Sequence, residues 1–315
     1  MYLNPKTLLV LAFGAALAAC SGNGGGTALP GNTGAGEASS MNAAQPALSS
    51  HTMRDPESST VSHVMYTKDV ANLMGRTGTV NRAAGVPMIW HGGPVQQNPH
   101  IYIVYWGWKS DPSGVAPVMN AFFGGVGGSQ WLSSQTQYTD STGNVGNQSG
   151  MLAGTWSDNT NRLASPVTQS ALAAEARRAV KHFVGSYAVS SNYIIATPHH
   201  HSESGFGTQW CAYHSTTSTK AGPVSWTYMP YMPDAGASCG AGFVNTPGTL
   251  DGVSIVGGHE QAETMTDPQL NAWYDVNGAE TGDKCAWTGL QNTTFSTGTF
   301  PTQPLWSNSA DGCVQ

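Results

Sequence analysis

Two short apolar runs predict the core strands of this chain. Residues 100–106 (HIYIVYW) are β-branched and aromatic and follow a proline, which is typical of a buried strand. Residues 193–197 (YIIAT) have the same character and predict a second core strand. Residues 202–248 are rich in Gly, Ser, Thr and aromatic residues, so we expect loops and short strands there.

Helical patterns lie between and after these runs. Residues 114–123 predict a short helix. Residues 167–184 (VTQSALAAEARRAVKHFV) predict a long one, because Ser165-Pro166 supplies a cap and a first-turn proline. Residues 251–266 predict a third helix. It should end before Asp267-Pro268, because the residue before a proline is pushed out of the α region.

Strands and helices alternate along the same stretch, which predicts an α/β (α+β) fold with a mixed sheet. All ten Trp lie at Trp90 or beyond, so we expect a single packed domain over residues 86–315. That length is sufficient for one substantial hydrophobic core.

The N-terminal residues have the pattern of a targeting signal. Lys6 is followed by an apolar stretch over residues 8–17, which is too short to cross a bilayer of about 30 Å comfortably. Residues 1–19 are therefore predicted to be a lipoprotein-type signal peptide, with Cys20 as the lipidated mature N-terminus. The alternative is an ordinary signal peptide cut near Ala19. Either way we expect an exported protein, secreted or in the cell envelope, that meets the membrane only through a lipid anchor.

Residues 20–85 are predicted to be a disordered tether or a removable propeptide. Up to about residue 61 they are mainly Gly, Ser, Ala, Asn and Thr, and no aromatic residue occurs before Tyr66. Such a segment cannot bury enough apolar surface to offset the entropy lost on ordering.

The charge balance argues against one class of partner. The chain has 12 Lys and Arg against 18 Asp and Glu, and a formal net charge of −6. Nucleic-acid-binding domains instead carry an excess of basic residues, so we expect no nucleic-acid partner. The sequence carries no signal for an oligomeric state.

Four cysteines remain besides Cys20. An even number in an exported protein indicates disulfides, and we expect nearest neighbours to pair, Cys211 with Cys239 and Cys285 with Cys313. A zinc site built from all four cysteines is the alternative, although the spacings lack any C-x2-C element.

The third predicted helix carries an H-E-x-x-E string at residues 259–263. His259 and Glu263 are four residues apart, so they lie on one helix face and can bind one zinc ion together. Glu260 lies about 100° round the helix, where it could act as general base on a metal-bound water. This is the arrangement of H-E-x-x-H metallopeptidases with a glutamate in place of the second histidine. Because the second ligand is anionic, the string supports metal binding more strongly than catalysis.

An acidic cluster surrounds this string. Residues 251–283 contain seven Asp and Glu and no Lys or Arg. The carboxylates would repel one another, and a bound cation would reduce this repulsion. We expect Asp275 to be the third zinc ligand, because Trp273 and Tyr274 would anchor its loop, with Glu280 and Asp283 as alternatives. A separate calcium loop of Asp275, Asn277, Glu280 and Asp283 is a further alternative.

Other histidines are weaker candidates. His199, His200 and His201 follow a predicted strand, and the first and third of them could face one metal ion; His214, near Cys211, is another candidate. Surface or packing roles are the simpler interpretation of each. No G-x-S-x-G motif is present, so the sequence does not indicate a serine hydrolase of that type.

Two stretches resemble known families. Residues 91–95 (HGGPV) and the run NPHIYIVYWG resemble the opening of the phosphate-induced (EXORDIUM-like) secreted family. H-E-x-x-E-x-x-T-D-P, W-Y-D, G-x-E-x-G-D-x-C and L-W-S-N are similar to bacterial exported zinc-metallopeptidase-like proteins. The resemblance spans about residues 88–313. It implies a zincin-like fold with the metal on the helix that carries His259 and Glu263.

The main functional hypothesis is therefore a zinc-dependent metallopeptidase that hydrolyses a peptide or protein substrate, with His259, Glu263 and Asp275 on the metal and Glu260 as base. The first alternative is a non-enzymatic envelope protein that binds polysaccharide or a partner through exposed aromatic residues and holds a structural metal. The second is a calcium-stabilised module.

Overall fold

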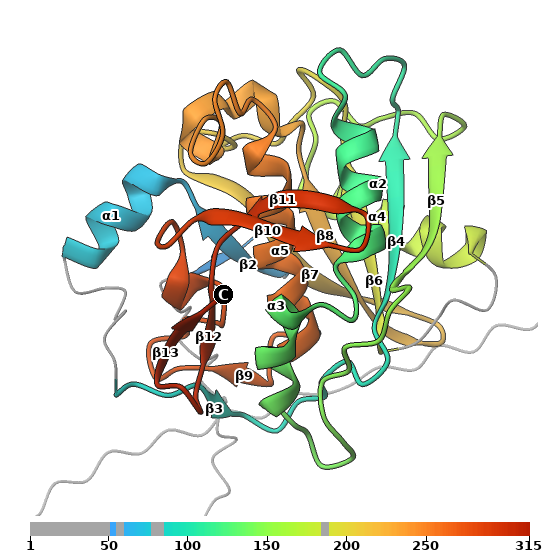
Figure 1. Cartoon of the computed structure of the whole chain (residues 1–315). Helices are drawn as coiled ribbons and strands as arrows, with labels where there is room; N and C mark the ends of the chain where they lie inside the picture. The colour runs from blue at the N-terminus through green and yellow to red at the C-terminus, as the bar shows by residue number, and fades with distance from the viewer. Residues whose placement is uncertain (1–50, 55–59, 77–84, 184–188) are drawn as a thin grey trace, which may run out of the picture. The chain divides into compact units, whose positions relative to one another are not determined.

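A seven-stranded mixed sheet forms the framework of the domain, with the strand order β1-β2-β7-β8-β6-β4-β5 (Figure 1). The computed structural model describes residues 51–54, 60–76, 85–183 and 189–315, all within the unit Ala47–Gln315. The sheet strands are β1 (Thr52–Arg54), β2 (Val61–Tyr66), β4 (His100–Trp106), β5 (Leu152–Asp158), β6 (Ser191–Ala196), β7 (Trp210–Thr219) and β8 (Gly222–Met229). Strands β8, β6, β4 and β5 are parallel, whereas β1, β2 and β7 add antiparallel pairs.

Helices and three small sheets surround this framework. The helices are α1 (Lys68–Arg76), α2 (Val115–Gly125), α3 (Gln130–Ser133), α4 (Gln169–His182) and α5 (Asp251–Thr266), with 3-10 helices η1 (Ser134–Gln137), η2 (Met232–Cys239) and η3 (Asp283–Cys285). The small antiparallel pairs are β3 (Ile89–Trp90) with β9 (Trp273–Tyr274), β10 (Gln291–Phe295) with β11 (Gly298–Thr302), and β12 (Leu305–Ser307) with β13 (Gly312–Val314). The α/β class with a mixed sheet is confirmed; the zincin-like topology stays a prediction.

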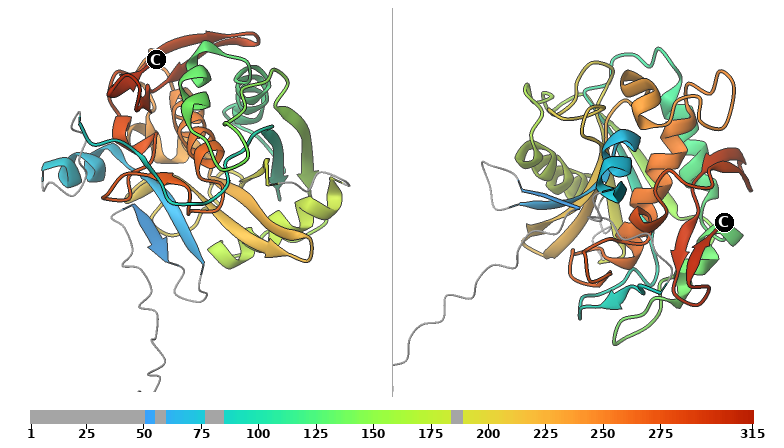
Figure 2. Two further views of the ribbon diagram at one scale, coloured as in Figure 1. Left: turned by 90° about the horizontal axis from the view of Figure 1, so that it is seen from below. Right: turned by 90° about the vertical axis from the view of Figure 1, so that its left-hand side faces the viewer.

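Both faces of the central strands are buried, so the strands read as continuous apolar runs. In β4, Ile101 and Ile103 pack into the cluster that includes α2 and α5. Val104, which points to the opposite face, packs with α4 residues such as Leu172. Figure 2 shows α4 on one side of the sheet and α2 with α5 on the other.

Helix α5 is the innermost helix, and all sixteen of its residues are buried. Two glycines allow neighbours to approach it closely. A Cβ atom at Gly257 would lie 3.0 Å from the Phe123 ring, and one at Gly258 would lie 3.0 Å from Phe122 and Trp131. On another side, the hydroxyl of Ser254 donates to the β11 carbonyl of Pro301 at 2.6 Å. Polar groups on this helix must therefore find their partners inside the protein.

Several element predictions are confirmed with shifted ends. The predicted strand at residues 100–106 and the helix at residues 251–266 have the expected bounds. Helix α4 begins later than expected because Thr168, rather than Ser165, is its cap and accepts a hydrogen bond from the Ala171 amide. In residues 202–248, the Thr-rich and aromatic pattern forms two long strands, β7 and β8, instead of short ones.

The predicted domain start near residue 86 needs correction. Strands β1 and β2 precede it, and β2 pairs with β7 along Ser62–Tyr66. The apolar positions of β2 bury Val64 and Met65, so this part of the expected tether belongs to the sheet. The predicted signal peptide and Cys20 lie outside the described residues.

The predicted nearest-neighbour disulfides are confirmed. Cys211 of β7 is bonded to Cys239 at the end of η2, and Cys285 of η3 to Cys313 of β13. Each bond closes a sequence separation of 28 residues, and a loop of this size is worth about 3.6 kcal/mol in the chain-entropy model. None of the helices in the described ranges is long and apolar enough to cross a membrane.

Candidate metal centre

Helix α5 places two of the predicted ligands together in the core. His259 Nε2 lies 3.1 Å from Glu263 Oε1, one helical turn away, and both side chains are fully buried. The contact follows from their i, i+4 spacing. The structure thus brings together the pair that the H-E-x-x-E string predicts.

Two histidines from the sheet face this pair. His63 of β2 and His214 of β7 are directly opposite in the strand register, and their ring centroids are 5.6 Å apart. His63 Nδ1 lies 3.8 Å from Glu263 Oε2, and His214 Nδ1 lies 3.7 Å from the same oxygen. Neighbouring strands therefore deliver two imidazoles to one carboxylate of α5.

The loop after α5 supplies two more carboxylates. Glu280 Oε1 is 3.6 Å from His63 Nε2, and Glu280 Oε2 is 3.6 Å from His214 Nε2. Asp283 approaches His63 Nδ1 and His259 Nε2, both at 3.6 Å. The loop is fixed to the helix because the amides of Gly282 and Asp283 donate to Glu263 Oε1 at 3.1 and 2.9 Å.

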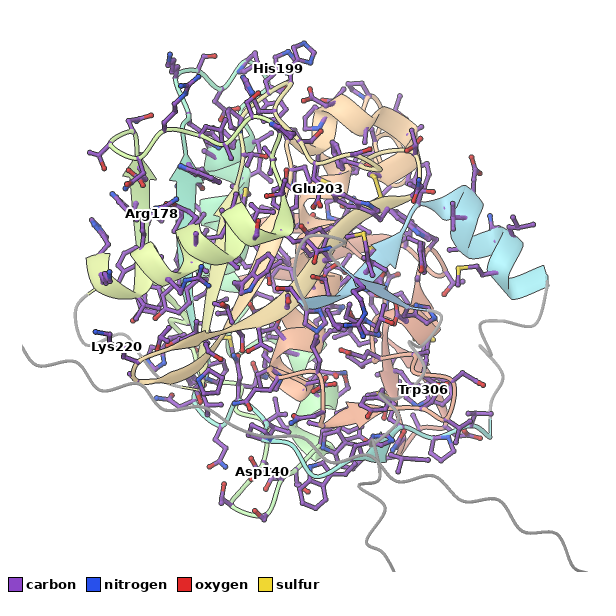
Figure 3. The ribbon with its side chains drawn as sticks, turned by 180° about the vertical axis from the view of Figure 1, so that it is seen from behind. Asp140, Arg178, His199, Glu203, Lys220 and Trp306 are labelled. Atoms are coloured by element: carbon purple, nitrogen blue, oxygen red, sulfur yellow. A yellow bond between two sulfur atoms is a disulfide. The ribbon has the colours of Figure 1, made fainter. Side chains whose placement is uncertain are left out.

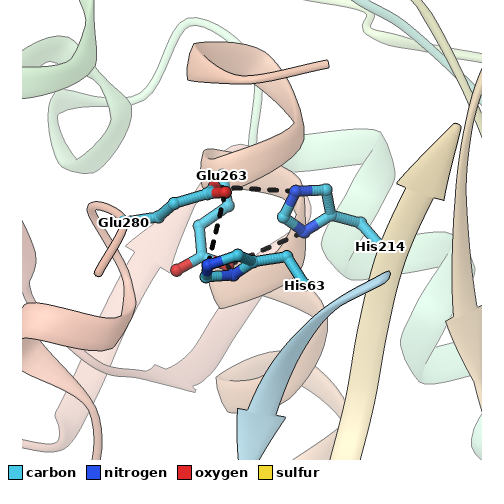
Figure 4. A group of neighbouring side chains, drawn as sticks. All are labelled: His63, His214, Glu263 and Glu280. Carbon is cyan, nitrogen blue, oxygen red and sulfur yellow. Dashed lines mark ion pairs between the residues drawn. The ribbon is translucent and has the colours of Figure 1, made fainter. Parts of the chain in front are cut away.

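These residues form two overlapping groups of potential ligands. In the first group, His63, His214, Glu263 and Glu280 each offer one ligand atom, and the four atoms lie within 4.8 Å of one another (Figure 4). The second group is His259, Glu263 and Asp283. Glu263 belongs to both groups, so the predicted pair on α5 lies at the centre of the cluster.

The hydrogen bonds of the two sheet histidines leave one ring nitrogen of each directed at the carboxylates. His63 Nε2 lies 2.9 Å from the Gly278 carbonyl, which fixes the proton on that nitrogen. His214 Nδ1 contacts Glu260 Oε2 at 3.1 Å. Within the described residues, His63 Nδ1 and His214 Nε2 have no hydrogen-bond partner. Metal-binding histidines show this pattern, with one nitrogen held by the protein and the other left for the ion.

The carboxylates also carry buried oxygens that lack partners. Glu263 Oε2 and both oxygens of Glu280 accept no hydrogen bond from any described residue. The two unpartnered histidine nitrogens lie 3.8 Å (His63 Nδ1 to Glu263 Oε2) and 3.6 Å (His214 Nε2 to Glu280 Oε2) from these oxygens, beyond hydrogen-bond length. Ligands at about 2.1 Å from a tetrahedral zinc ion would be about 3.4 Å apart. A two-histidine, two-carboxylate donor set with this spacing could hold a divalent metal ion.

Buried carboxylates dominate the electrostatics of the cluster and compete with the histidines for protons. Burial, reinforced by neighbouring carboxylates, raises the pKa values of Glu260 and Glu280 well above their usual value. Burial lowers the pKa of His214 to about 3. Burial opposes a charge on His63 as well, but Asp283 and Glu263 outweigh it and raise its pKa to about 9. A divalent cation would replace the protons that the cluster otherwise has to share.

Asp275, the expected third ligand, is not brought to this cluster. Its Oδ1 accepts hydrogen bonds from the amides of Asn277 and Ala279 at 2.8 and 3.0 Å. Its Oδ2 lies 3.2 Å from the buried ammonium of Lys284. These contacts use the carboxylate to shape the loop. The alternative of a separate calcium loop is also divided, since Glu280 and Asp283 face the histidines instead of Asp275.

Glu260, the expected general base, lies beside the centre. Its Oε2 contacts His214 Nδ1, and both side chains are fully buried. In this position the carboxylate fixes the orientation of the His214 ring, as the carboxylate partners of metal-bound histidines do.

Sequence reasoning missed His63, because it lies in the stretch that we assigned to a tether. The signal that could have found it is the apolar spacing around it in VSHVMY, residues 61–66. His214 was named as a weaker candidate, and its place opposite His63 depends on strand pairing that the sequence does not show. His199 and His200 belong to a separate group with Asp234.

No family model and no solved structure matches this chain. The chain is 28% identical over 241 residues to "Protein EXORDIUM-like 5" of Arabidopsis thaliana, and the aligned part covers 64% of this chain and 64% of that protein. The chain therefore matches just under two thirds of the relative's length. This distant similarity supports the EXORDIUM-like resemblance. The comparisons do not support a relationship to bacterial H-E-x-x-E metallopeptidases.

Proposed function

We propose that the chain is an exported, non-enzymatic binding protein whose core is held together by a buried structural zinc ion. The observation that carries this proposal is the burial of the candidate ligands His63, His214, Glu263 and Glu280, whose side chains are at most 5% exposed. A catalytic zinc site keeps a coordination position open to water and substrate, whereas a structural site is closed by protein groups.

The ion would join segments that are far apart in the sequence. His63 and His214 come from two strands, Glu263 from α5 and Glu280 from the following loop. Zinc binding energy at such a site contributes directly to folding. The two disulfides are typical of a protein outside the cytoplasm and support export. Attachment through a lipid on Cys20 is part of this proposal.

An exposed apolar surface supports a binding role. Ile89, Trp90 and Val276 are 41, 40 and 72% exposed, and β3 pairs with β9 so that Ile89 lies opposite Tyr274. Large exposed aromatic residues are common at interaction sites. We propose that the β3–β9 pair binds polysaccharide through the half-exposed Trp90 ring, because a flat aromatic ring next to polar groups suits a sugar face.

Zinc-dependent peptide hydrolysis is the competing proposal. The H-E-x-x-E string supports it, with Glu260 as base on a zinc-bound water. It requires that substrate reach a centre which the described residues enclose. The exchange of Glu260 for glutamine distinguishes the two proposals, because glutamine can still hold the His214 ring but cannot accept the water's proton.

The decisive experiment combines metal analysis with an activity assay on the purified chain. We expect zinc to be retained through dialysis. Removal of the zinc by a strong chelator should lower the melting temperature of the protein. Peptides and unfolded proteins should remain uncleaved. A chain that contains no metal after folding with zinc, or that melts unchanged after chelation, would contradict the structural-zinc proposal. Cleavage that is abolished in Glu260→Gln would establish the metallopeptidase instead.

A further inference from the structure

The carboxyl ends of the parallel strands meet at one edge of the sheet, where the connections diverge. Strand β4 lies between β6 and β5. The chain leaves β4 towards α2, which packs with α5 on one face. After β6 it turns to the other face, where the Glu203 amide donates to the hydroxyl of Tyr228, a member of the α4 cluster. Such a divergence between neighbouring parallel strands is where open α/β sheets bind their ligands.

Histidines and an aspartate gather at this edge. His199 and His200 follow β6, and Asp234 lies in η2, which follows β8. The His199 Nδ1 atom is paired with Asp234 Oδ1, and the His200 amide donates to Asp234 Oδ2 at 2.7 Å. One ligand atom from each residue lies within 4.8 Å of the others. Figure 3 shows His199 at the end of the molecule to which the parallel strands point.

The local backbone turns both imidazoles towards the same place. His200 adopts a left-handed φ of 62°, which is uncommon for a residue other than glycine. Its ring thereby lies against that of His199, with centroids 3.6 Å apart and an interplanar angle of 31°. The Asp234 carboxylate pairs with the ring nitrogen of His199 and accepts a hydrogen bond from the backbone amide of His200. One side chain therefore orients the two histidines.

We propose that His199, His200 and Asp234 form a second zinc site, separate from the buried centre. The two imidazoles supply the zinc ligands, and Asp234, whose two oxygens are taken by His199 Nδ1 and the His200 amide, orients them. Because Asp234 engages His199 through Nδ1, Nε2 of that ring is left to bind the ion, as in carboxylate–histidine–zinc arrangements. The side chain of His199 is 40% exposed, so coordination positions remain for water or for an anionic ligand.

An aromatic wall beside the histidines gives the site a second side. The Tyr231 ring lies 5.4 Å from that of His199 and 5.5 Å from that of Trp108. Trp108 is held by the hydrogen bond of its Nε1 to the Ala196 carbonyl at 2.8 Å. Loops after β4, β6 and β8 thus contribute to one site, whereas the buried centre is built from β2, β7, α5 and the loop that follows it.

The test is a zinc titration of the full chain. The buried centre is first loaded with zinc, and loosely bound zinc is then removed with a weak chelator. We expect one remaining zinc site, absent in His199→Ala and in His200→Ala. In Asp234→Asn, zinc affinity should fall about 10- to 100-fold, the usual cost of losing an orienting carboxylate. Because these residues are at the surface, circular dichroism of the variants should match that of the parent chain.

His201→Ala is the matched control, since His201 is the third histidine of the same run but is outside the group. It should bind zinc as the parent does. The proposal is overturned if the parent takes up no zinc beyond that bound by His199→Ala, or if His201→Ala loses as much affinity as His199→Ala. Copper(II) resonance spectra provide a second readout, because nitrogen splitting from two imidazoles should be reduced to that from one in either histidine variant.

Discussion

The residues of the buried centre depend on one another through shared contacts. His63 and His214 each bind a protein group through one ring nitrogen and turn the other towards a carboxylate. Glu263 is within reach of both rings and also receives two loop amides. A single substitution therefore disturbs metal binding, loop position and the protonation of the remaining groups together.

His214→Ala is expected to abolish zinc retention in the core. The variant removes one of the two sheet imidazoles and leaves Glu260 and Glu280 without the ring between them. Leaving a buried polar group without a partner costs about 1–3 kcal/mol. Zinc content by elemental analysis and the free energy of unfolding by denaturant titration measure both effects. The exposed His201→Ala should change neither, and retention of the core zinc in His214→Ala would exclude this ring as a ligand.

Gly282 is the position where the loop meets the α5 ligands most closely. A Cβ atom there would lie 2.7 Å from His259 Nδ1 and 2.9 Å from Glu263 Oε1. Gly282→Ala should therefore push the loop away and destabilise the protein by about 1–3 kcal/mol. Gly124→Ala is the control, because its Cβ would approach the nearest side chain, Thr297, only to 3.8 Å and alanine favours a helix. Equal melting temperatures for the two variants would contradict the tight contact.

At the scale of elements, the sequence predicts the helices and strands whose signals lie within their own segments. Strand β4 and helix α5 are found at their expected bounds because an apolar run and an Asp-Pro stop are contained in the segments themselves. The place of β2 depends on pairing with β7, some 150 residues later, which no local pattern encodes. For the same reason His259 and Glu263 are predictable as a pair, whereas His63 opposite His214 is not.

Helix α4 contains a carboxyl group that should make stability depend on pH. Burial raises the pKa of Glu175 to about 7, although Arg178 counteracts it. The folded state then binds this proton more tightly than the unfolded state, so its contribution to stability is complete below about pH 4.5 and is lost as the pH rises towards 7.

Glu175→Gln should remove this dependence, because glutamine does not titrate. Relative to the parent chain, the variant is expected to gain about 1–3 kcal/mol as the pH rises from 4.5 to 8. Denaturant unfolding over a pH series measures the difference, and parallel curves for parent and variant across that range would contradict the prediction. The attraction to Arg178 strengthens as Glu175 ionises and is already contained in the pKa of about 7, so its loss is part of the same pH-dependent difference.

The β3–β9 pair carries the proposed polysaccharide surface. Trp90→Ala should reduce retention on insoluble cell-wall polysaccharides by about tenfold or more, because central Trp residues contribute strongly to binding. Leu73→Ala is the control: it removes an apolar side chain that is 62% exposed but lies on α1. Equal retention of both variants would place the binding surface elsewhere.

At the scale of the whole molecule, the metal centre and the sheet define where the domain begins. The unit that contains the described residues starts at Ala47, and its first strands bring His63 to the cluster. Composition alone predicts a later start of the domain, because the two short strands within residues 52–66 directly follow a Gly- and Ser-rich stretch. A few apolar residues in a polar segment can thus belong to the core when the rest of the sheet supplies their partners.

Two shortened chains test this boundary. A chain that starts at Ala47 should fold, retain the core zinc and melt close to the full chain, since it keeps β1, β2 and His63. A chain that starts at Val86 loses one imidazole and exposes the edge of β7, so it should fail to retain the core zinc and tend to aggregate. Elemental analysis and light scattering of the two preparations make the comparison. If the shorter chain binds zinc in the core and stays monomeric at the same melting temperature, then β2 and His63 are dispensable and the remaining candidate ligands form the centre.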